Sequence, residues 1–289
     1  MTALTMFAPA KINLYLHVTG RRDDGYHLLD SLVGFAAIGD RITIVPGTHF
    51  QLTIAGPFGS ALAEGDPNAN LAVRAARALA AATGRELDCR IILEKNLPLA
   101  SGIGGGSSDA ATTLLALAML WDLPSTALPL ADLARGLGQD VVSCLYRRAC
   151  YFQGIGDMIA PGPDLPPCGI VLVNPDIQVP TPAVFKARTG AFSSPAPLTP
   201  PHDLADLVTQ LRARRNDLYA PAVQLAPAIA ACLNAVTTMP DCLLARMSGS
   251  GATCFGLFAD SAQAETARAM LASRHPGWWI AAGALPFRD

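Results

Sequence analysis

The residues of this sequence best suited to chemistry form a glycine-rich loop. The segment from Leu99 to Asp109 reads LASGIGGGSSD and contains four glycines and three serines. A run of glycine is entropically costly to order, so it marks a place where another group approaches the backbone closely. The flanking patterns predict a strand over residues 89–95 and an apolar helix over 108–121. A strand, a glycine loop, hydroxyls and a helix N-terminus form an anion site, because backbone N–H groups and the helix dipole attract phosphate.

Three better-known loops do not match this segment. A Walker A loop requires a lysine where this sequence has Ser107, and the dinucleotide fingerprint requires a glycine at the same place. The G-x-S-x-G pattern of a nucleophile elbow does not occur. An alternative to the anion site is an ordinary turn, in which Ser107 or Ser108 is the N-cap of the following helix.

The composition limits the classes of protein to consider. About half of the 289 residues are apolar, 15% are charged, and the net charge is −2, which argues against nucleic acid or an anionic membrane as the main partner. No segment has the roughly 18–20 apolar residues of a membrane span. Seven scattered cysteines without a C-x-x-C pair indicate a reduced, cytoplasmic protein with buried thiols. The five histidines show no ligand spacing, so we expect no metal held by the protein itself.

The elements that must position the loop are those of an α+β protein. Residues 11–18 alternate, which predicts a strand with its apolar positions facing the core and with Lys11, Asn13, Tyr15 and His17 on the other face. Residues 41–45 and 50–56 predict further strands. A helix begins after Asn68 or Asn70 and ends at Gly84, and another lies near 129–137.

The second half of the chain predicts a further unit. A proline-rich stretch at 161–167 precedes the apolar strand 169–175, which indicates a domain boundary. The proline-rich stretch 193–201 is expected to be a surface loop, and helices with proline breaks follow it. A glycine-rich turn leads into a strand at 252–258, then a helix over 261–274 and a last strand over 278–285. We therefore expect two α+β domains, residues 1–160 and 161–289.

Several segments together resemble the GHMP kinase superfamily. They are the lysine-bearing first strand, the loop from Pro98 to Ala111, and SGSGA from Ser248 to Ala252. The segments APAKINLYLHVTGRRDDGYHLLDSL, GDRITI, NLAVRAA, VPTPAVFK and RMSGSGATCF occur in the expected order, and the resemblance extends from Ala8 to Phe258. It implies a first domain like domain 2 of ribosomal protein S5, which binds ATP, and a ferredoxin-like second domain, which binds the substrate.

The resemblance also implies a reaction. The first segment is typical of members that use ATP, with Mg²⁺, to phosphorylate the 2-hydroxyl of a methylerythritol carried on cytidine diphosphate, in the non-mevalonate route to isoprenoids. By family position Asp140 accepts the hydroxyl proton, while Lys11 keeps that carboxylate charged and holds the hydroxyl. Taken alone, Lys11 is typical of a solvated strand residue and Asp140 of a turn or N-cap acid. The family usually reads Gly-Ala-Asp-Val-Pro here, whereas this chain has Gln139 before Asp140 and Val142-Ser143 after Val141.

The remaining site residues are carried over by motif position. Tyr26 and Phe185 are expected to sandwich the cytosine, with His27 at its edge, although such aromatics are more often core or turn residues. The residues implied for the substrate are Asn13, Tyr26, His27, Thr181, Phe185, Gly249 and Gly251. Those implied for ATP are Asn70, Lys95, Pro98, Leu99, Ala100, Ser101, Gly102, Ile103, Gly104, Gly105, Gly106, Ser107 and Ser108.

Two other interpretations stay open. The chain could be another GHMP kinase, such as a homoserine or mevalonate kinase, but the segments GRRDDGYH and VPTPAVFK serve a cytidine and argue against this. It could also be a nucleotide-binding protein without catalytic activity, because the residues after Asp140 differ from the family pattern. In each case the partners are small molecules, and the sequence indicates no oligomeric state.

Overall fold

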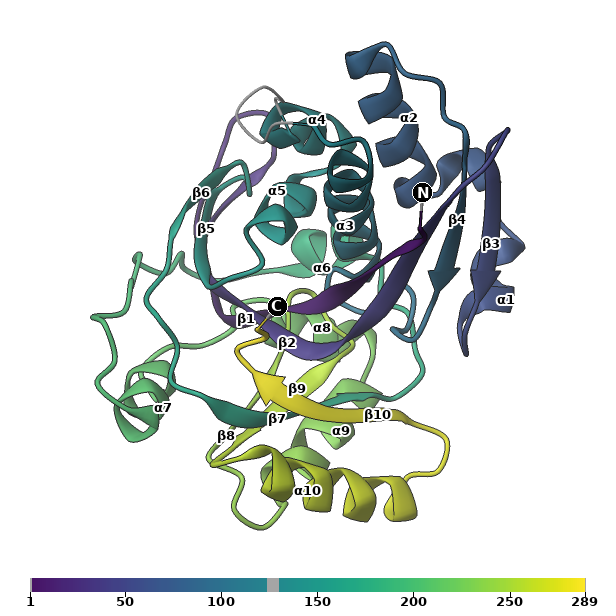
Figure 1. Cartoon of the computed structure of the whole chain (residues 1–289). Coiled ribbons are helices and arrows are strands. Elements are labelled where there is room, and N and C mark those ends of the chain that lie inside the picture. Colours follow the sequence, from purple (N-terminus) through teal and green to yellow (C-terminus); the bar gives the residue numbers. More distant parts are fainter. Residues whose placement is uncertain (1, 124–129, 289) are drawn as a thin grey trace. The chain divides into compact units, whose positions relative to one another are not determined.

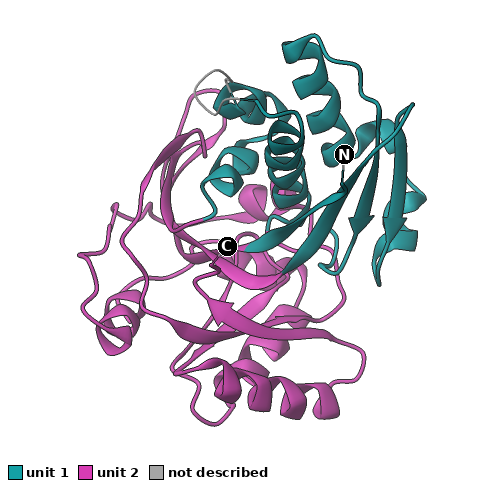
Figure 2. Ribbon diagram, viewed as in Figure 1, with its two compact units in different colours: residues 1–10, 39–99, 104–147 teal, residues 11–38, 100–103, 148–289 magenta. Residues whose placement is uncertain are grey.

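The chain is organised in two compact units that are interleaved along the sequence. The computed structural model describes residues 2–123 and 130–288. Unit 1 consists of residues 1–10, 39–99 and 104–147, and unit 2 of residues 11–38, 100–103 and 148–289 (Figures 1 and 2). Two long strands, β1 (Leu4–Arg21) and β2 (His27–Pro46), run through both. The expected division of the chain into two contiguous domains, residues 1–160 and 161–289, stays a prediction.

Unit 1 contains a small sheet and a set of helices. Strand β4 (Cys89–Glu94) pairs in parallel with β3 (Gln51–Ala55) and antiparallel with residues 41–46 of β2. The helices are α1 (Gly59–Ala63), α2 (Leu71–Thr83), α3 (Gly105–Leu120), α4 (Leu130–Leu137) and α5 (Gln139–Tyr146), with a 3₁₀ turn at Pro67–Ala69. The helix expected near 129–137 is thus present from residue 130; its predicted first residue, 129, lies outside the described residues.

Helix α2 begins and ends where its cap residues predict. The Asn70 side chain accepts a hydrogen bond from the Ala72 N–H (2.9 Å), and Gly84 adopts the left-handed conformation at φ 63°. Helix α3 packs against α2 and α5. It is apolar on all sides and buries most of its residues, as expected for a helix in the interior of its unit.

Unit 2 is built on a four-stranded antiparallel sheet with the order β10-β7-β9-β8 (Figure 1). The strands are β7 (Cys168–Asn174), β8 (Leu244–Met247), β9 (Cys254–Phe258) and β10 (Trp279–Leu285). Helix α9 (Ala228–Thr237) packs on β8 and β9, and α10 (Ser261–Arg274) packs on β7 and β10. Strands β5 (Cys150–Gly154) and β6 (Met158–Pro161) pair with each other, and β5 pairs with residues 29–33 of β2. Helices α6 (Thr181–Ala187), α7 (Leu204–Arg212) and α8 (Tyr219–Leu225) complete the unit.

Glycines reveal what lies on the two faces of this sheet. A Cβ on Gly169 would meet the backbone of Asp260 and the methyl of Ala264 in α10, and one on Gly256 would meet Val236 in α9. Gly169 and Gly256 point to the same face, because Gly256 pairs with Val171, two residues from Gly169. Both helices therefore cover one face of the sheet. The opposite face, at Gly283, contacts residues 37–38 of β2.

Strand β1 is confirmed, but its predicted single core face is wrong. Lys11, Asn13, Tyr15 and His17 are all buried, like the apolar positions between them. Several of their polar atoms have hydrogen-bond partners in unit 2: the Tyr15 hydroxyl, for example, donates to Asp30 Oδ2 (3.0 Å). A strand can therefore bury its polar face where the surrounding segments supply hydrogen-bond partners.

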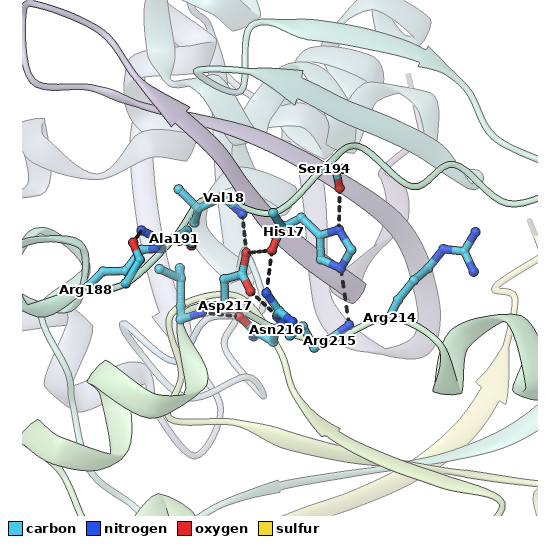
Figure 3. Close-up of polar contacts among 12 residues, drawn as sticks. His17, Val18, Arg188, Ala191, Ser194, Arg214, Arg215, Asn216 and Asp217 are labelled. Atoms are coloured by element: carbon cyan, nitrogen blue, oxygen red, sulfur yellow. Dashed lines mark hydrogen bonds and ion pairs between the residues drawn. The ribbon is translucent and has the colours of Figure 1, made fainter.

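The far end of the buried part of β1 is held by a polar network (Figure 3). His17 Nδ1 donates to the Ser194 carbonyl oxygen (3.0 Å), while Nε2 accepts from the Arg215 N–H (3.4 Å). Asp217 accepts from the Val18 N–H (2.8 Å) and from the Arg215 side chain (2.6 Å). This network joins β1 to the loop around residue 194 and to residues 215–217 before α8.

Two further expectations are decided by the structure. All seven cysteines are free thiols, and all but Cys242 are buried, which confirms the predicted buried thiols. No helix among the described residues is both long and apolar enough to cross a membrane.

Candidate functional site

The second half of the glycine loop forms the N-terminus of α3 in unit 1. The N-cap is Gly104, at φ 63°, and no side chain caps the helix. Ser107 and Ser108 lie inside the helix, so the interpretation of either serine as the N-cap is wrong. The first backbone N–H groups of an α-helix have no intrahelical acceptor, and the N-cap Gly104 has no side chain to supply one. The helix N-terminus therefore offers uncapped donors and a positive dipole end to an anion.

A buried charge cluster lies next to this helix N-terminus. The Lys95 ammonium contacts Asp40 Oδ2 (2.5 Å) and Asp109 Oδ2 (2.7 Å), and all three side chains are almost completely buried. Asp40 Oδ1 also accepts from the N–H groups of residues 96 and 97. A Cβ added to Gly105 would lie 3.0 Å from Lys95 Nζ, so the ammonium sits against the first residue of α3.

The electrostatics of the cluster follow from its burial. Burial raises the pKa of Asp109 to about 7, against the opposing effect of Lys95. Asp109 Oδ1 has no hydrogen-bond partner among the residues that the structure describes. Burial lowers the pKa of Lys95, but the charges of Asp109 and Asp40 outweigh it and leave that pKa raised. Lys95 therefore stays charged, with its ammonium committed to two carboxylates. Asn70, the other residue implied for the adenosine, uses its side-chain oxygen as the cap of α2. A contact of either residue with ATP stays a prediction.

The first half of the loop, residues 100–103, packs within unit 2 against the SGSGA segment. The Ser248 hydroxyl donates to the Gly102 carbonyl oxygen (3.0 Å), and the Thr253 N–H donates to the Ser101 carbonyl oxygen (3.1 Å). Gly102 has φ +77°, and a Cβ there would lie 2.6 Å from the Gly251 oxygen and 2.7 Å from the Ser248 oxygen. Only glycine fits at this approach of two backbones.

Strand β1 brings the predicted substrate residues to the same place in unit 2. The Lys11 N–H donates to the Ile103 carbonyl oxygen (2.9 Å), and the Asn13 N–H donates to Ser248 Oγ (3.1 Å). The Lys11 side chain is only 4% exposed, and its ammonium lies 5.0 Å from the centre of the Phe152 ring. Lys11 is therefore not the solvated strand residue of the alternative interpretation. Lys11, Asn13, the loop residues 101–103 and the SGSGA segment form one hydrogen-bonded group.

The residues implied for the cytosine are arranged differently from the expected sandwich. The rings of His27 and Phe185 are stacked on each other, with centroids 5.2 Å apart and 25° between planes. Tyr26 is 60% exposed. Burial, together with the charges of Arg21 and Arg188, lowers the pKa of His27, so its imidazole is neutral near pH 7. His27 and Phe185 thus form a preassembled aromatic pair beside an exposed tyrosine.

Asp140 lies in the first turn of α5, in unit 1, and is half-buried. Asp140 therefore lies within a helix and not in a loop turn, and it is not the N-cap, which is Gly138. The departure from the family pattern is accommodated in the same helix: Val142 and Ser143 are buried, and the Ser143 hydroxyl donates to the Asp140 carbonyl oxygen (2.8 Å). The pairing of Asp140 with Lys11, which belongs to unit 2, stays a prediction.

Some residues of the site were not found from the sequence. Ser248 is the first residue of the SGSGA motif, of which only the glycines were predicted to belong to the site. Its hydroxyl nevertheless links Asn13 to Gly102. Asn216 Nδ2 donates to the carbonyl oxygens of Met247 and Gly249, both at 2.8 Å, and so fixes the SGSGA segment. Nothing in the local sequence around Asn216 signals this role. The Thr181 hydroxyl lies 2.8 Å from that of Ser250, and its contact with the substrate stays a prediction. In the part of the chain that the structure describes, no three His, Cys, Asp or Glu side chains gather as a metal site.

The fold and this site define a class of phosphotransferase. Residues 70–148 match the model of the GHMP kinases N terminal domain, and residues 202–277 match that of the GHMP kinases C terminal domain. The chain is 50% identical over 282 residues to the 4-diphosphocytidyl-2-C-methyl-D-erythritol kinase of Paramagnetospirillum magneticum, covering 97% of this chain and 98% of that protein. It is 52% identical over 280 residues to the enzyme of that name from Paracoccus denitrificans, covering 96% and 95%. The chain belongs to the family of 4-diphosphocytidyl-2-C-methyl-D-erythritol kinases within the GHMP kinases.

Solved structures agree with this assignment. A crystal structure of a 4-(cytidine 5'-diphospho)-2C-methyl-D-erythritol kinase superposes with a TM-score of 0.82 at 34% identity and covers 99% of this chain and 100% of that one. The mevalonate kinase of Methanococcus jannaschii gives a TM-score of 0.68 at 11% identity, covering 100% and 99%. That second likeness shows the shared fold alone. The predicted α+β GHMP kinase fold is thus confirmed.

Proposed function

We propose that the protein transfers the γ-phosphoryl group of ATP to the 2-hydroxyl of 4-diphosphocytidyl-2-C-methyl-D-erythritol, giving the 2-phosphate and ADP in the non-mevalonate route to isoprenoids. The observation that carries this proposal is the identity of about half of all positions with kinases of that name, over nearly the full length of both chains. The uncapped N-terminus of α3, preceded by a loop in which Gly102 leaves no room for a side chain, supports the phosphate site.

The nucleotide is proposed to bind along residues 98–108, with its phosphates on the N–H groups at the start of α3. Gly105 and Gly106 leave these groups accessible, and the helix dipole adds a partial positive charge. Mg²⁺, held by the nucleotide phosphates, supplies charge neutralisation on the transferred group. The Ser107 hydroxyl is half-buried in the first turn and is placed to add a hydrogen bond there. Asn70 and Lys95 are proposed to lie near the adenosine.

The chemical step requires a base and an orienting cation. Asp140 is proposed to accept the proton of the attacking 2-hydroxyl as its oxygen bonds to the γ-phosphorus and the bond to the ADP oxygen breaks. Lys11 is proposed to hold that hydroxyl by a charge-assisted hydrogen bond. Its burial and its position over the Phe152 ring restrict the ammonium to few orientations, which suits a group that must orient a reacting atom.

The cytidine end of the substrate is proposed to bind where Tyr26, His27 and Phe185 meet. A neutral His27 offers one donor and one acceptor to the edge of the base, which matches the mixed pattern of cytosine. Tyr26 is free to close over the ring because its side chain is largely exposed. Thr181, Gly249 and Gly251 are proposed to line the path from the base to the hydroxyl.

The organisation of the protein follows from the same proposal. Residues 1–160 are proposed to form an ATP-binding domain and residues 161–289 a substrate-binding domain, each of which contains the range of one family model. The partners are small molecules rather than nucleic acid or membrane, and the location is the cytoplasm, in keeping with seven free thiols.

The proposal is tested by measuring ADP release from purified protein. We expect turnover with 4-diphosphocytidyl-2-C-methyl-D-erythritol, and little with free methylerythritol, mevalonate or homoserine, because these lack the remote group whose binding orients the hydroxyl. Equal turnover of free methylerythritol would overturn the cytidine pocket. A protein that binds ATP but releases no ADP with any of these alcohols would be a nucleotide-binding protein without this activity.

A further inference from the structure

The side-chain amide of Asn13 is held in one orientation by a chain of hydrogen bonds. Asn13 Nδ2 lies 2.8 Å from the hydroxyl oxygen of Ser31, a fully buried residue of β2. The same hydroxyl lies 2.5 Å from the carbonyl oxygen of Tyr15. A carbonyl oxygen only accepts, so the one proton of Ser31 goes to Tyr15 and the hydroxyl oxygen must accept from Asn13. The NH₂ end of the amide therefore faces Ser31. In the alternative rotamer two acceptor oxygens, Asn13 Oδ1 and Ser31 Oγ, would face each other.

The other end of the amide faces the proposed substrate site. Among the residues that the structure describes, none donates a hydrogen bond to Asn13 Oδ1, although the residue is nearly buried. A Cβ added to Gly249 would lie 3.5 Å from this oxygen, which places it beside a residue implied for substrate binding. The backbone N–H of Asn13 is already used by Ser248. The side-chain oxygen is thus an oriented acceptor without a donor.

We propose that Ser31 is a positioning residue, which fixes Asn13 so that it presents only a hydrogen-bond acceptor to the substrate and thereby selects an alcohol O–H. The inference rests on the proposed function, since it takes Asn13 to contact the methylerythritol unit. A polyol supplies the hydroxyl that Oδ1 requires, whereas a carboxylate or phosphate oxygen at this point would oppose it. Ser31 itself touches no substrate. It acts through Asn13, and its strand partner in β5 is Phe152, which lies under Lys11.

A double-mutant cycle tests whether Ser31 acts through Asn13. In Ser31→Ala the side-chain amide of Asn13 has lost the hydroxyl that accepts from its NH₂ group, so nothing distinguishes the NH₂ end from the Oδ1 end. We expect kcat/KM for 4-diphosphocytidyl-2-C-methyl-D-erythritol to fall about 3- to 10-fold, the range of one neutral hydrogen bond, with KM for ATP unchanged. Asn13→Ala is expected to lower the same constant at least as much. Adding Ser31→Ala to Asn13→Ala should then have no further effect beyond about twofold.

Controls separate this role from a general effect on the fold. Thr113→Ala deletes another buried hydroxyl, one that bonds only to its own helix through the Asp109 carbonyl oxygen, and should leave KM for the cytidine substrate unchanged. Ser31→Cys keeps the shape of the side chain with a weaker donor and acceptor, so it should give a smaller loss than alanine.

The outcomes are distinct. The inference would be overturned if the losses of kcat/KM in the two single variants multiplied in the double variant, or if Ser31→Ala affected the cytidine substrate and ATP equally. Either result would show that Ser31 is merely structural. Absence of turnover in the unmodified enzyme would instead overturn the proposed function.

Discussion

Gly102 and Ser248 are joined by a hydrogen bond of 3.0 Å across 146 positions of the chain. The hydroxyl of Ser248 donates to the Gly102 carbonyl oxygen, and its oxygen also accepts from the Asn13 N–H. One serine therefore connects the loop proposed for ATP with the strand proposed for the substrate. The arrangement depends on the close approach of two backbones, which makes Gly102 its most sensitive point.

We expect Gly102→Ala to destabilise the protein by at least about 2 kcal/mol, because a left-handed φ and a clash with two backbone oxygens act together. The matched control is Gly136→Ala in α4, where a Cβ would meet no atom within 4 Å. That change should stabilise the helix by about 0.5–1 kcal/mol. Urea unfolding of both variants measures the difference, and equal effects would show that the loop tolerates a side chain at Gly102.

Asp140→Asn is expected to fold normally and to bind both substrates while losing most of its turnover. A positioned base contributes about 10²–10⁴-fold in rate, or roughly 3–5 kcal/mol of barrier. Asp132→Asn is the control, because it makes the same change at an exposed residue of α4 whose partner is Arg135. A value of kcat within threefold of the unmodified enzyme would mean that Asp140 is not the base.

Tyr26→Ala should raise KM for the cytidine substrate about 5- to 150-fold, the equivalent of roughly 1–3 kcal/mol of base stacking, with KM for ATP little changed. The melting temperature should stay the same, since Tyr26 is 60% exposed. Phe192→Ala removes another exposed aromatic, which lies over Arg188, and serves as the control. Phe185→Ala should weaken substrate binding and also lower stability, because it loses the stacked His27 ring. An unchanged KM in Tyr26→Ala would contradict the position assigned to the base.

The stability of the protein should depend on pH through Asp109. Its pKa is raised to about 7 by burial, so the folded state binds a proton more tightly than the unfolded state does. This contribution to stability is fully present below the unfolded pKa of about 4 and is lost as pH rises through 7. Relative to Asp109→Asn, the unmodified protein should lose about 2–3 kcal/mol between pH 5 and pH 8. Denaturant unfolding at both pH values gives this difference, and a constant difference would rule out titration of Asp109 in this range.

Elements with a long periodic pattern could be predicted from the sequence. Four such elements are present where their patterns indicate: the strand at residues 11–18, which is part of the longer β1, helix α2 with its Asn70 cap, helix α10 and strand β10. Helix α3 begins at residue 105 rather than 108, because glycines that look unfavourable for a helix form its first turn. The short strands β5, β6 and β8 and the helices α5 and α6 were not predicted. Segments of four to eight residues give few repeats of any period, and tertiary contacts decide their conformation.

The residues of the candidate site could also be predicted only in part from the sequence. Motif positions indicated candidate residues for the chemistry, but not the residues that hold them. Asn13 could be named from its motif, whereas Ser31 and Asn216 could not, since a single hydrogen bond between distant segments leaves no pattern in the local sequence. For the same reason the stacking of His27 on Phe185 was not foreseen.

The interleaving of the two units has a consequence for the order in which the protein is made. Unit 1 has all of its residues once the ribosome has passed residue 147, whereas unit 2 requires residues that extend from 11 to 289. Its sheet acquires the edge strand β10, at 279–285, only after residue 285 has been synthesised. Until then residues 37–38 of β2 lack their contact with Gly283. Neither unit corresponds to one continuous stretch of coding sequence, so genetic rearrangement cannot exchange either one intact as a single segment.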